Sequence, residues 1–144
     1  MTYGNMMKRK TLIFLLRNNL TEIKRISGIV KNFPGSQGLT KKTLFEITLC
    51  IDEHVTNIIS HGYRDSDEHW IKITLSREEK KFIVRIEDDG LPYNPIETAA
   101  PDLETPLEER KIGGLGIHLV KHHMDNIDYQ RHGTSNVFIM TKNL

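Results

Sequence analysis

The stretch Leu44–Tyr63 constrains the fold most, because its residues repeat at the spacing of one long α-helix with two distinct faces. At about 100° per residue, one side is apolar and wide enough to pack on a core: Leu44, Ile47, Ile51, Val55 and Ile58. The other side collects polar residues and one thiol: Glu46, Cys50, Glu53, Asn57 and His61. A solvated helix face usually carries lysine and alternating charge, but this one has no lysine and places the Glu53 carboxylate one turn from the Asn57 carboxamide. The pair suits a hard cation such as Mg²⁺ and a general base. The alternative is an ordinary polar outer face.

Length and composition favour a single soluble domain that spans residues 1–144. The 144 residues carry a net charge of +1, with both signs mixed along the chain. No basic stripe with interleaved aromatic residues is present, so we do not expect a nucleic-acid partner. The apolar run Thr11–Leu16 is too short for a signal peptide, and no stretch has the length of a transmembrane helix. We therefore expect a cytoplasmic protein without a membrane partner.

The single cysteine, Cys50, excludes an internal disulfide. It has no base nearby in the sequence, so we expect a small core thiol rather than a nucleophile. Several histidines lie on two of the predicted helices, but no further set of Cys or His completes a zinc-site spacing: His54, His61, His118, His122 and His123. We expect no structural zinc, and we expect His61 to interact with the C-terminal dipole of its helix.

Apolar periodicity elsewhere predicts further helices and strands. Lys8–Arg17 is predicted to be a strand at a sheet edge or a dimer interface, and Leu20–Phe33 to be a helix. Pro34–Gly38 breaks the chain, and Thr40 is placed to cap the long helix, which ends near Gly62. The remaining elements are a two-strand hairpin, a helix and two closing strands: Trp70–Leu75, Lys81–Asp88, Leu115–Met124, Ile127–Arg131 and Val137–Lys142. This order predicts an α+β fold, a two-layer sandwich with helices on one face of a mostly antiparallel, mixed sheet.

A second polar feature, Glu87-Asp88-Asp89-Gly90, ends the second strand of the hairpin. The strand period places Asp88 on the same side as Phe82, Val84 and Ile86, so its carboxylate points toward the core. A carboxylate there is costly without a partner, and a buried acceptor at a strand end can bind the exocyclic amine of an adenine. Gly90 would let the backbone approach a ligand closely. The alternative is an ordinary acidic turn.

A third feature, Gly113–Val120, has three glycines at the start of a predicted helix. The unpaired N–H groups and the helix dipole favour an anion there, and phosphate is the obvious one. Glycines also serve simple turns and close packing, so the cluster alone is weak evidence. The long segment Leu91–Gly113 before it is predicted to be a loop, and loops of this length tend to be functional lids.

These three features occur in the order found in the GHKL (Bergerat-fold) ATP-binding domains, which the sequence resembles from about Thr40 to Lys142. EHVTNIISHGY is similar to the N box, EDDGLPYNP to the first glycine box, and ERKIGGLGIHLVKHHMDNIDY to the second glycine box. Within that family the sequence is most similar to the anti-sigma-factor serine kinases. Pro92 stands where many relatives have a second glycine, as in this smaller kinase subgroup. That residue, and the lack of a preceding phosphoacceptor-histidine helix, argue against a chaperone, a gyrase, a mismatch-repair ATPase or a sensor histidine kinase.

The resemblance implies roles for particular residues. Asn57 would bind Mg²⁺, Glu53 would be the catalytic base, Asp88 would bind the adenine amine and Gly90 would shape the pocket. The lid, residues 91–113, and the phosphate end would include Arg110, Gly114 and Gly116. Asn136 matches a recurring position whose role is open.

Three hypotheses follow from the sequence. The first is an ATP-binding serine/threonine-protein kinase that acts as an anti-sigma regulatory factor, with ATP and Mg²⁺ as cofactors. Its partners by resemblance are a sigma factor and a STAS-type anti-sigma-factor antagonist, which it would phosphorylate, and it would form a homodimer. The second is an ATP-gated protein-binding module with little or no kinase activity. The third is an α/β scaffold that binds no nucleotide.

Overall fold

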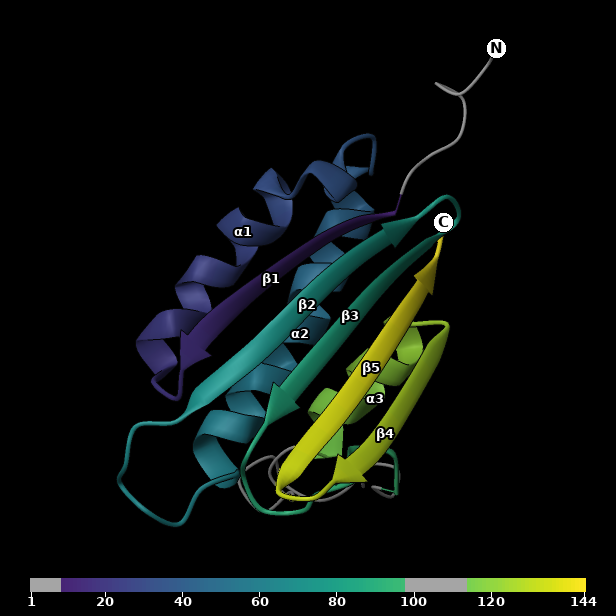
Figure 1. Cartoon of the computed structure of the whole chain (residues 1–144). Coiled ribbons are helices and arrows are strands. Elements are labelled where there is room, and N and C mark those ends of the chain that lie inside the picture. Colours follow the sequence, from purple (N-terminus) through teal and green to yellow (C-terminus); the bar gives the residue numbers. More distant parts are fainter. Residues whose placement is uncertain (1–8, 98–113) are drawn as a thin grey trace.

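The computed structural model describes residues 9–97 and 114–144, with no side-chain description for residues 114 and 115. The chain forms five strands, three α-helices and three short 3₁₀ helices in these ranges (Figure 1). In chain order these are β1 (Lys10–Arg17), η2 (Leu20–Arg25), α1 (Ile26–Asn32), η3 (Pro34–Ser36), α2 (Lys41–His61), β2 (Trp70–Glu78), β3 (Lys81–Asp88), η4 (Pro95–Glu97), α3 (Gly114–His123), β4 (Asn126–His132) and β5 (Ser135–Asn143).

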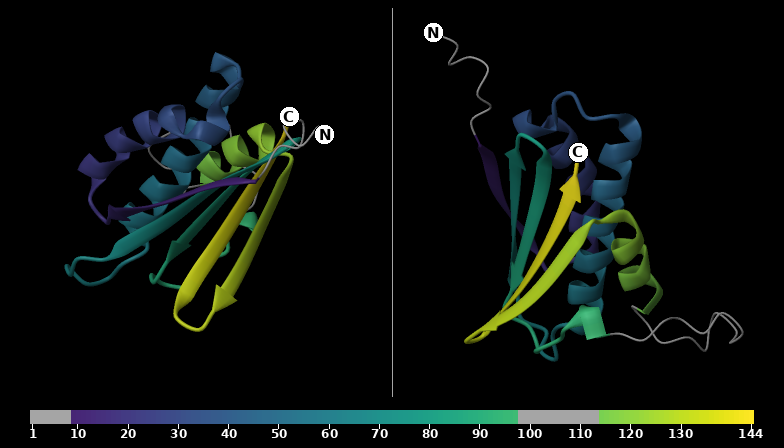
Figure 2. Two further views of the ribbon diagram at one scale, coloured as in Figure 1. Left: turned by 45° about the horizontal axis from the view of Figure 1, so that its top comes forward. Right: turned by 90° about the vertical axis from the view of Figure 1, so that its right-hand side faces the viewer.

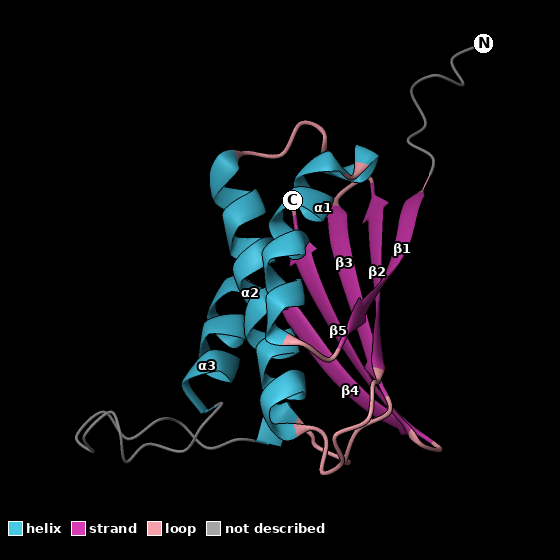
Figure 3. Ribbon diagram, turned by 90° about the vertical axis from the view of Figure 1, so that its left-hand side faces the viewer, coloured by secondary structure: helices cyan, strands magenta, loops and turns pink. Residues whose placement is uncertain are grey.

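The strands form one sheet in the order β1-β2-β3-β5-β4, and the helices cover one of its faces (Figure 3). This arrangement confirms the predicted α+β sandwich. We expected a mostly antiparallel, mixed sheet, and every pairing between the described strands is antiparallel. The pairing of β3 with β5 matters most for function, because it places Asn136 directly opposite Asp88.

Helix α2 is the long helix that the sequence predicts. The Thr40 hydroxyl accepts a hydrogen bond from the Thr43 amide at 3.1 Å and so caps its first turn. The predicted apolar stripe packs on the sheet, with Ile47, Ile51, Val55 and Ile58 buried and Leu44 partly buried.

The opposite side of α2 is less exposed than a polar outer face would be, because α3 packs against α2 (Figure 2). Glu46, Cys50 and His54 are all buried. Cys50 is fully buried, and burial raises the pKa of its thiol to about 12. The prediction of a core thiol is confirmed.

The predicted helix Leu20–Phe33 is wrong in detail, since the segment is a 3₁₀ helix followed by a short α-helix. The tight first turns are tied back to the end of β1. The Asn19 side chain accepts from the Thr21 amide, and the Glu22 carboxylate accepts from the Arg17 amide, each at 3.0 Å. The apolar residues Ile26 and Val30 still face the core as the helical spacing indicated.

Strand β1 lies at the edge of the sheet and pairs with β2. Its inward residue Leu16 is fully buried, whereas Ile13 and Leu15 on the outer face are 55% and 47% exposed. The hairpin of β2 and β3 turns at Glu79 and Lys80, slightly later than the predicted Arg77–Lys80 link, because β2 continues to Glu78. Among the described helices, none is long and apolar enough to cross a membrane.

Candidate functional site: a buried acid in a cavity between helix and sheet

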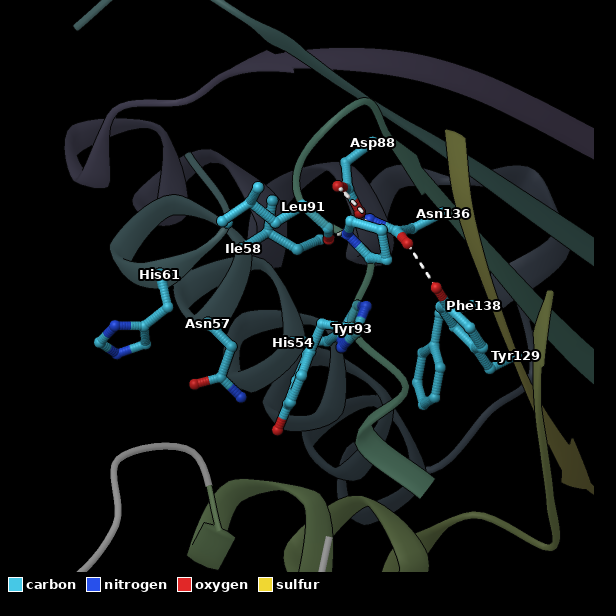
Figure 4. A pocket seen from close by; sticks show the side chains of 12 residues that line it. His54, Asn57, Ile58, His61, Asp88, Leu91, Tyr93, Tyr129, Asn136 and Phe138 are labelled. Carbon is cyan, nitrogen blue, oxygen red and sulfur yellow. Dashed lines mark hydrogen bonds between the residues drawn. The ribbon is translucent and has the colours of Figure 1, made fainter. Parts of the chain in front are cut away.

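A cavity of about 260 Å³ lies between α2 and the sheet, at the end where β3 finishes and β5 begins (Figure 4). Its walls come from α2, from the segment that follows β3, and from β4 and β5. The lining residues are His54, Asn57, Ile58, His61, Gly62, Asp88, Leu91, Pro92, Tyr93, Tyr129, Asn136 and Phe138. The cavity therefore joins residues from the first two polar features of the sequence.

Asp88 is the acidic group of this cavity. It is the last residue of β3 and is only 6% exposed, on the inward side shared with Phe82, Val84 and Ile86, as predicted. Its Oδ1 accepts hydrogen bonds from the Gly90 amide at 2.9 Å and from Asn136 Nδ2 at 3.0 Å. Burial raises the pKa of the Asp88 carboxyl above its ordinary value, although these two bonds oppose the shift. Both donors are neutral and both reach Oδ1, so Oδ2 is the oxygen left for a ligand.

Asn136, whose role the sequence left open, holds Asp88 and the start of the following segment together. Besides Asp88, its Nδ2 donates to the Leu91 carbonyl at 2.9 Å. Its Oδ1 accepts from the Tyr129 hydroxyl at 2.5 Å and from Arg131 Nη1 at 3.1 Å. All of its polar atoms are therefore engaged within the protein, and it fixes the orientation of the Asp88 carboxylate.

Gly90 permits a close backbone crossing beside Asp88. A Cβ atom at residue 90 would lie 2.6 Å from the Gly62 carbonyl oxygen, and the Leu91 amide donates to that same oxygen at 2.8 Å. Any side chain at this position would push the end of β3 away from the end of α2. The shape of the cavity wall thus depends on a glycine at position 90.

Glu53 and Asn57 meet the start of α3, which joins the first polar feature to the third. A Cβ atom at Gly116 would lie 2.8 Å from Glu53 Oε2 and 3.6 Å from Asn57 Nδ2. Gly114 is the first residue of α3. Arg110, and the remainder of the predicted lid from residue 98 to residue 113, lie outside the described residues.

This arrangement suits an elongated ligand with an amine-bearing ring and an anionic tail. The buried Asp88 carboxylate can accept from the amine, and the Asn57 carboxamide lies beside the N-terminus of α3, where an anion is favoured. Within residues 9–97 and 114–144 no group of three or more His, Cys, Asp or Glu side chains could hold a metal. A cation at Asn57 would bind the side-chain oxygen, which is the kind of ligand that Mg²⁺ prefers.

Sequence reasoning missed the aromatic walls of the cavity and the histidine among them. Phe138 and Tyr129 were assigned only to closing strands, and His54 was considered only as a zinc ligand. The ring of His54 stacks on Phe138, with centroids 4.1 Å apart and planes 23° apart. For Phe138 the strand period carries a signal, since Asn136, Phe138 and Met140 are each two residues apart and share one face of β5.

Fold and site together define a histidine-kinase-like ATPase domain, and comparison with known proteins agrees. Residues 16–142 match the histidine kinase-like ATPase domain family, and the chain belongs to it. Membership of this family implies ATP binding.

Three curated relatives illustrate the similarity. The serine/threonine-protein kinase BtrW of Bordetella bronchiseptica is 33% identical over 67% of this chain and 68% of its own length. The anti-sigma F factor of Clostridium novyi is 28% identical over 98% of this chain and 96% of its own. The anti-sigma F factor of Bacillus subtilis is 31% identical over 68% and 67%.

Among solved structures, the fold is similar to a histidine kinase domain from Erythrobacter litoralis EL346. That match has a TM-score of 0.51 and 19% identity, and covers 87% of this chain and 60% of the other. The blue-light activated histidine kinase of Erythrobacter litoralis EL346 matches with a TM-score of 0.55 and 18% identity, over 86% of this chain and 41% of the other. At this identity the likeness supports the fold alone.

Proposed function

We propose that this protein is an ATP-dependent serine/threonine-protein kinase that acts as an anti-sigma factor. It would bind a sigma factor and phosphorylate a STAS-type antagonist on a serine or threonine. The observation that carries the ATP site is the buried Asp88 carboxylate, which has only neutral donors and lies in the same cavity as Asn57. The kinase and anti-sigma activities are proposed from the named relatives, BtrW and the anti-sigma F factors.

Each site residue has a proposed task. Asp88 accepts the adenine amine, and Gly90 keeps the cavity wall in place. Asn57 would supply an oxygen ligand to Mg²⁺, and the bound ion would neutralise charge on the phosphates. The N-terminus of α3 at Gly114 and Gly116 binds phosphate, with Arg110 contributing from the lid formed by residues 91–113.

Glu53 is the proposed general base. Its Oε2 lies beside Gly116, at the point where α2 meets the start of α3. A carboxylate there can accept the proton of an incoming serine hydroxyl while backbone N–H groups hold the phosphate. Positioning and charge neutralisation are the main contributions in phosphoryl transfer.

The base assignment is tested with Glu53→Gln, which keeps the side-chain shape and removes the negative charge. This variant should bind ATP as the parent does and lose phosphotransfer by about 100-fold or more. Transfer is measured with radiolabelled ATP and candidate antagonist domains. Glu79→Gln, in the turn between β2 and β3, is the matched control and should transfer normally. Undiminished transfer by Glu53→Gln would remove Glu53 from the mechanism.

The second candidate is an ATP-gated binding module without kinase activity. In that case ATP would order the lid and change a partner surface, and ATP-dependent capture of a sigma factor would occur with no transfer of label. Both candidates require nucleotide binding. A thermal shift measurement with millimolar Mg-ATP separates them from a scaffold, since a ligand that binds the folded state raises the melting temperature.

We also propose a homodimer that uses β1. Ile13 and Leu15 on its outer face are about half exposed, and β1 is an edge strand. Light scattering at micromolar concentration should give twice the chain mass for the parent and for the control Thr134→Glu, an exposed substitution in the turn between β4 and β5, away from β1. Leu15→Glu should lower that mass toward the monomer. A monomeric parent would exclude the dimer.

A further inference from the structure

His54 is a buried histidine in the wall of the cavity. Neither the packing of the fold nor the proposed roles of the other site residues explain why a polar ring lies at this position. It lies on α2 directly after Glu53 and one turn before Ile58, and it is only 6% exposed. Its ring stacks on Phe138, and both rings line the cavity together with Asp88 (Figure 4). The stack fixes the plane of the imidazole. It does not explain the two nitrogens on the edge of the ring.

The imidazole is neutral under physiological conditions. Burial lowers the pKa of His54 to about 3, because a charged ring would lose its hydration inside the protein. A neutral imidazole carries one N–H donor and one acceptor nitrogen. His54 therefore brings hydrogen-bonding capacity into the cavity without adding charge.

That capacity is not used by the protein itself. The other well-packed histidines have partners: His69 bonds Asp65 and Asp89, and His123 bonds Glu46. No hydrogen bond joins either ring nitrogen of His54 to another described residue. Its nitrogens are also not sealed from solvent, since in the described part of the chain the fully buried polar side-chain atoms without partners are Asp52 Oδ1 and Tyr63 Oη. His54 is one of the described residues that line the Asp88 cavity.

The polar side chains near Asp88, where the adenine ring is proposed to bind, already form hydrogen bonds within the protein. Asn136 uses its amide on Asp88, Leu91, Tyr129 and Arg131. Asp88 retains one carboxylate oxygen, which accepts but cannot donate. An adenine presents ring nitrogens that are acceptors next to its donating amine, so a neutral N–H donor is the complement that Asp88 lacks.

We propose that His54 is a specificity-determining residue of the nucleotide site, whose neutral imidazole N–H donates a hydrogen bond to a ring nitrogen of the purine held by Asp88. The proposal rests on the proposed function, because it requires that the cavity binds ATP. Acceptor and donor together read two adjacent features of adenine. The stack on Phe138 orients the donor before the ligand arrives.

Calorimetric titration of ATP into the parent and into His54→Phe tests the proposal. Phenylalanine keeps an aromatic ring for the stack on Phe138 and removes both nitrogens. The variant should bind ATP about tenfold more weakly, the effect of one hydrogen bond lost in a buried site. His132→Phe, an exposed substitution at the β4–β5 turn, should bind like the parent. Equal affinity of the parent and His54→Phe would overturn the inference.

ATP analogues that lack one ring nitrogen test the same hydrogen bond from the side of the ligand. Among 1-deaza-, 3-deaza- and 7-deaza-ATP, one analogue should bind the parent about tenfold more weakly than ATP and should bind His54→Phe no more weakly than ATP. Three analogues that the parent binds as well as ATP would exclude the proposed bond. A parent that binds no ATP would overturn this inference together with the proposed function, whereas loss of the His54 effect alone would leave that function intact.

Nuclear magnetic resonance on the parent needs no variant and covers the case in which His54→Phe fails to fold. The ¹⁵N resonances of the His54 imidazole should move when ATP saturates the site, whereas those of His132 should not. A His54 signal that stays in place at saturation would contradict the proposal.

His54→Asn, which retains an amide donor, should recover part of the lost affinity.

Discussion

Two buried carboxylates at opposite ends of the sheet differ in the partners that surround them. Asp88 ends β3 beside the cavity, and Glu46 lies in the second turn of α2 at the far end, near the last residues of β5. Glu46 Oε2 accepts from Lys142 Nζ at 3.0 Å and from His123 Nδ1 at 3.2 Å. Asp88 accepts only from a backbone amide and the Asn136 carboxamide.

The difference lies in the charge of the partners. Lys142 bonds Glu46 and lowers the pKa of its carboxyl, whereas burial raises the pKa of Asp88. A carboxylate matched by a partly buried cation stabilises the fold and has little left to offer a ligand. A carboxylate held by neutral donors costs the fold stability and keeps an oxygen for binding. Glu46 was predicted on the same helix face as Glu53 and Asn57, but it belongs to the fold.

The largest expected difference between the two carboxylates is in how much each contributes to ATP affinity. Asp88→Asn should weaken ATP binding by about tenfold to 100-fold, because the carboxamide nitrogen would face the adenine amine with a second donor. Its oxygen can still accept from Gly90 and Asn136, so the unliganded fold should be at least as stable as the parent. Calorimetry and chemical denaturation measure both quantities. Unchanged ATP affinity would show that Asp88 is not the base-reading acid.

The corresponding substitution at the other carboxylate is Glu46→Gln. It leaves Lys142 without its charged partner and should reduce the free energy of unfolding by about 1–2 kcal/mol, less than for a fully buried pair because some solvent reaches the side chain. ATP affinity should be unchanged, as the two carboxylates lie at opposite ends. Urea denaturation of the parent and both variants gives the comparison. A Glu46→Gln protein with parental stability and weak ATP binding would reverse the two assignments.

The pH dependence of stability should have opposite signs at the two sites. The folded-state pKa of Glu46 is lowered, so its contribution is present above the unfolded-state pKa and is lost as the pH falls through the folded value. The folded-state pKa of Asp88 is raised, so its cost is present above that pKa and disappears as the pH falls toward the ordinary value of 3.8. On acidification, the parent should therefore lose its advantage over Glu46→Gln and gain relative to Asp88→Asn. The same sign for both differences would contradict the contrast.

The smallest effect concerns a third, more exposed arrangement beside the cavity. His69 Nε2 lies 2.7 Å from Asp65 Oδ1 and its Nδ1 lies 3.1 Å from Asp89 Oδ1, and the hydrogen bond that the ring donates to Asp65 raises the pKa of His69. A raised histidine pKa gives stability that is complete below the unfolded-state value and is lost as the pH rises through the folded value. The stability difference between the parent and His69→Gln should therefore shrink as the pH rises above neutrality. Thermal melts across the pH range, with His132→Gln as control, measure this difference, and a gap that widens with pH would be inconsistent with a charged bridge.

Much of the fold follows from short-range patterns in the sequence. The apolar stripe of α2, its Thr40 cap and the in-phase position of Asp88 depend on helix and strand periods, which the sequence displays directly. The segment after Asn19 was harder, because side-chain bonds to the end of β1 tightened its first turns into a 3₁₀ helix.

Long-range contacts set the limit for the site. Asn136 faces Asp88 only because β5 pairs with β3 in one register, and Gly116 reaches Glu53 only because α3 packs on α2. The burial of Glu46 and the stack of His54 on Phe138 also depend on packing between elements far apart in the chain. Local periodicity places a residue on a face, and tertiary contacts decide what meets that face.

The most direct test of the central claim, that the Asp88 cavity holds the base of ATP, is a crystal structure with Mg²⁺ and a non-hydrolysable ATP analogue. We predict that the exocyclic amine lies about 3 Å from an Asp88 carboxylate oxygen and that the metal contacts the Asn57 side-chain oxygen. A base bound elsewhere, with the Asp88 cavity filled only by water, would contradict the account.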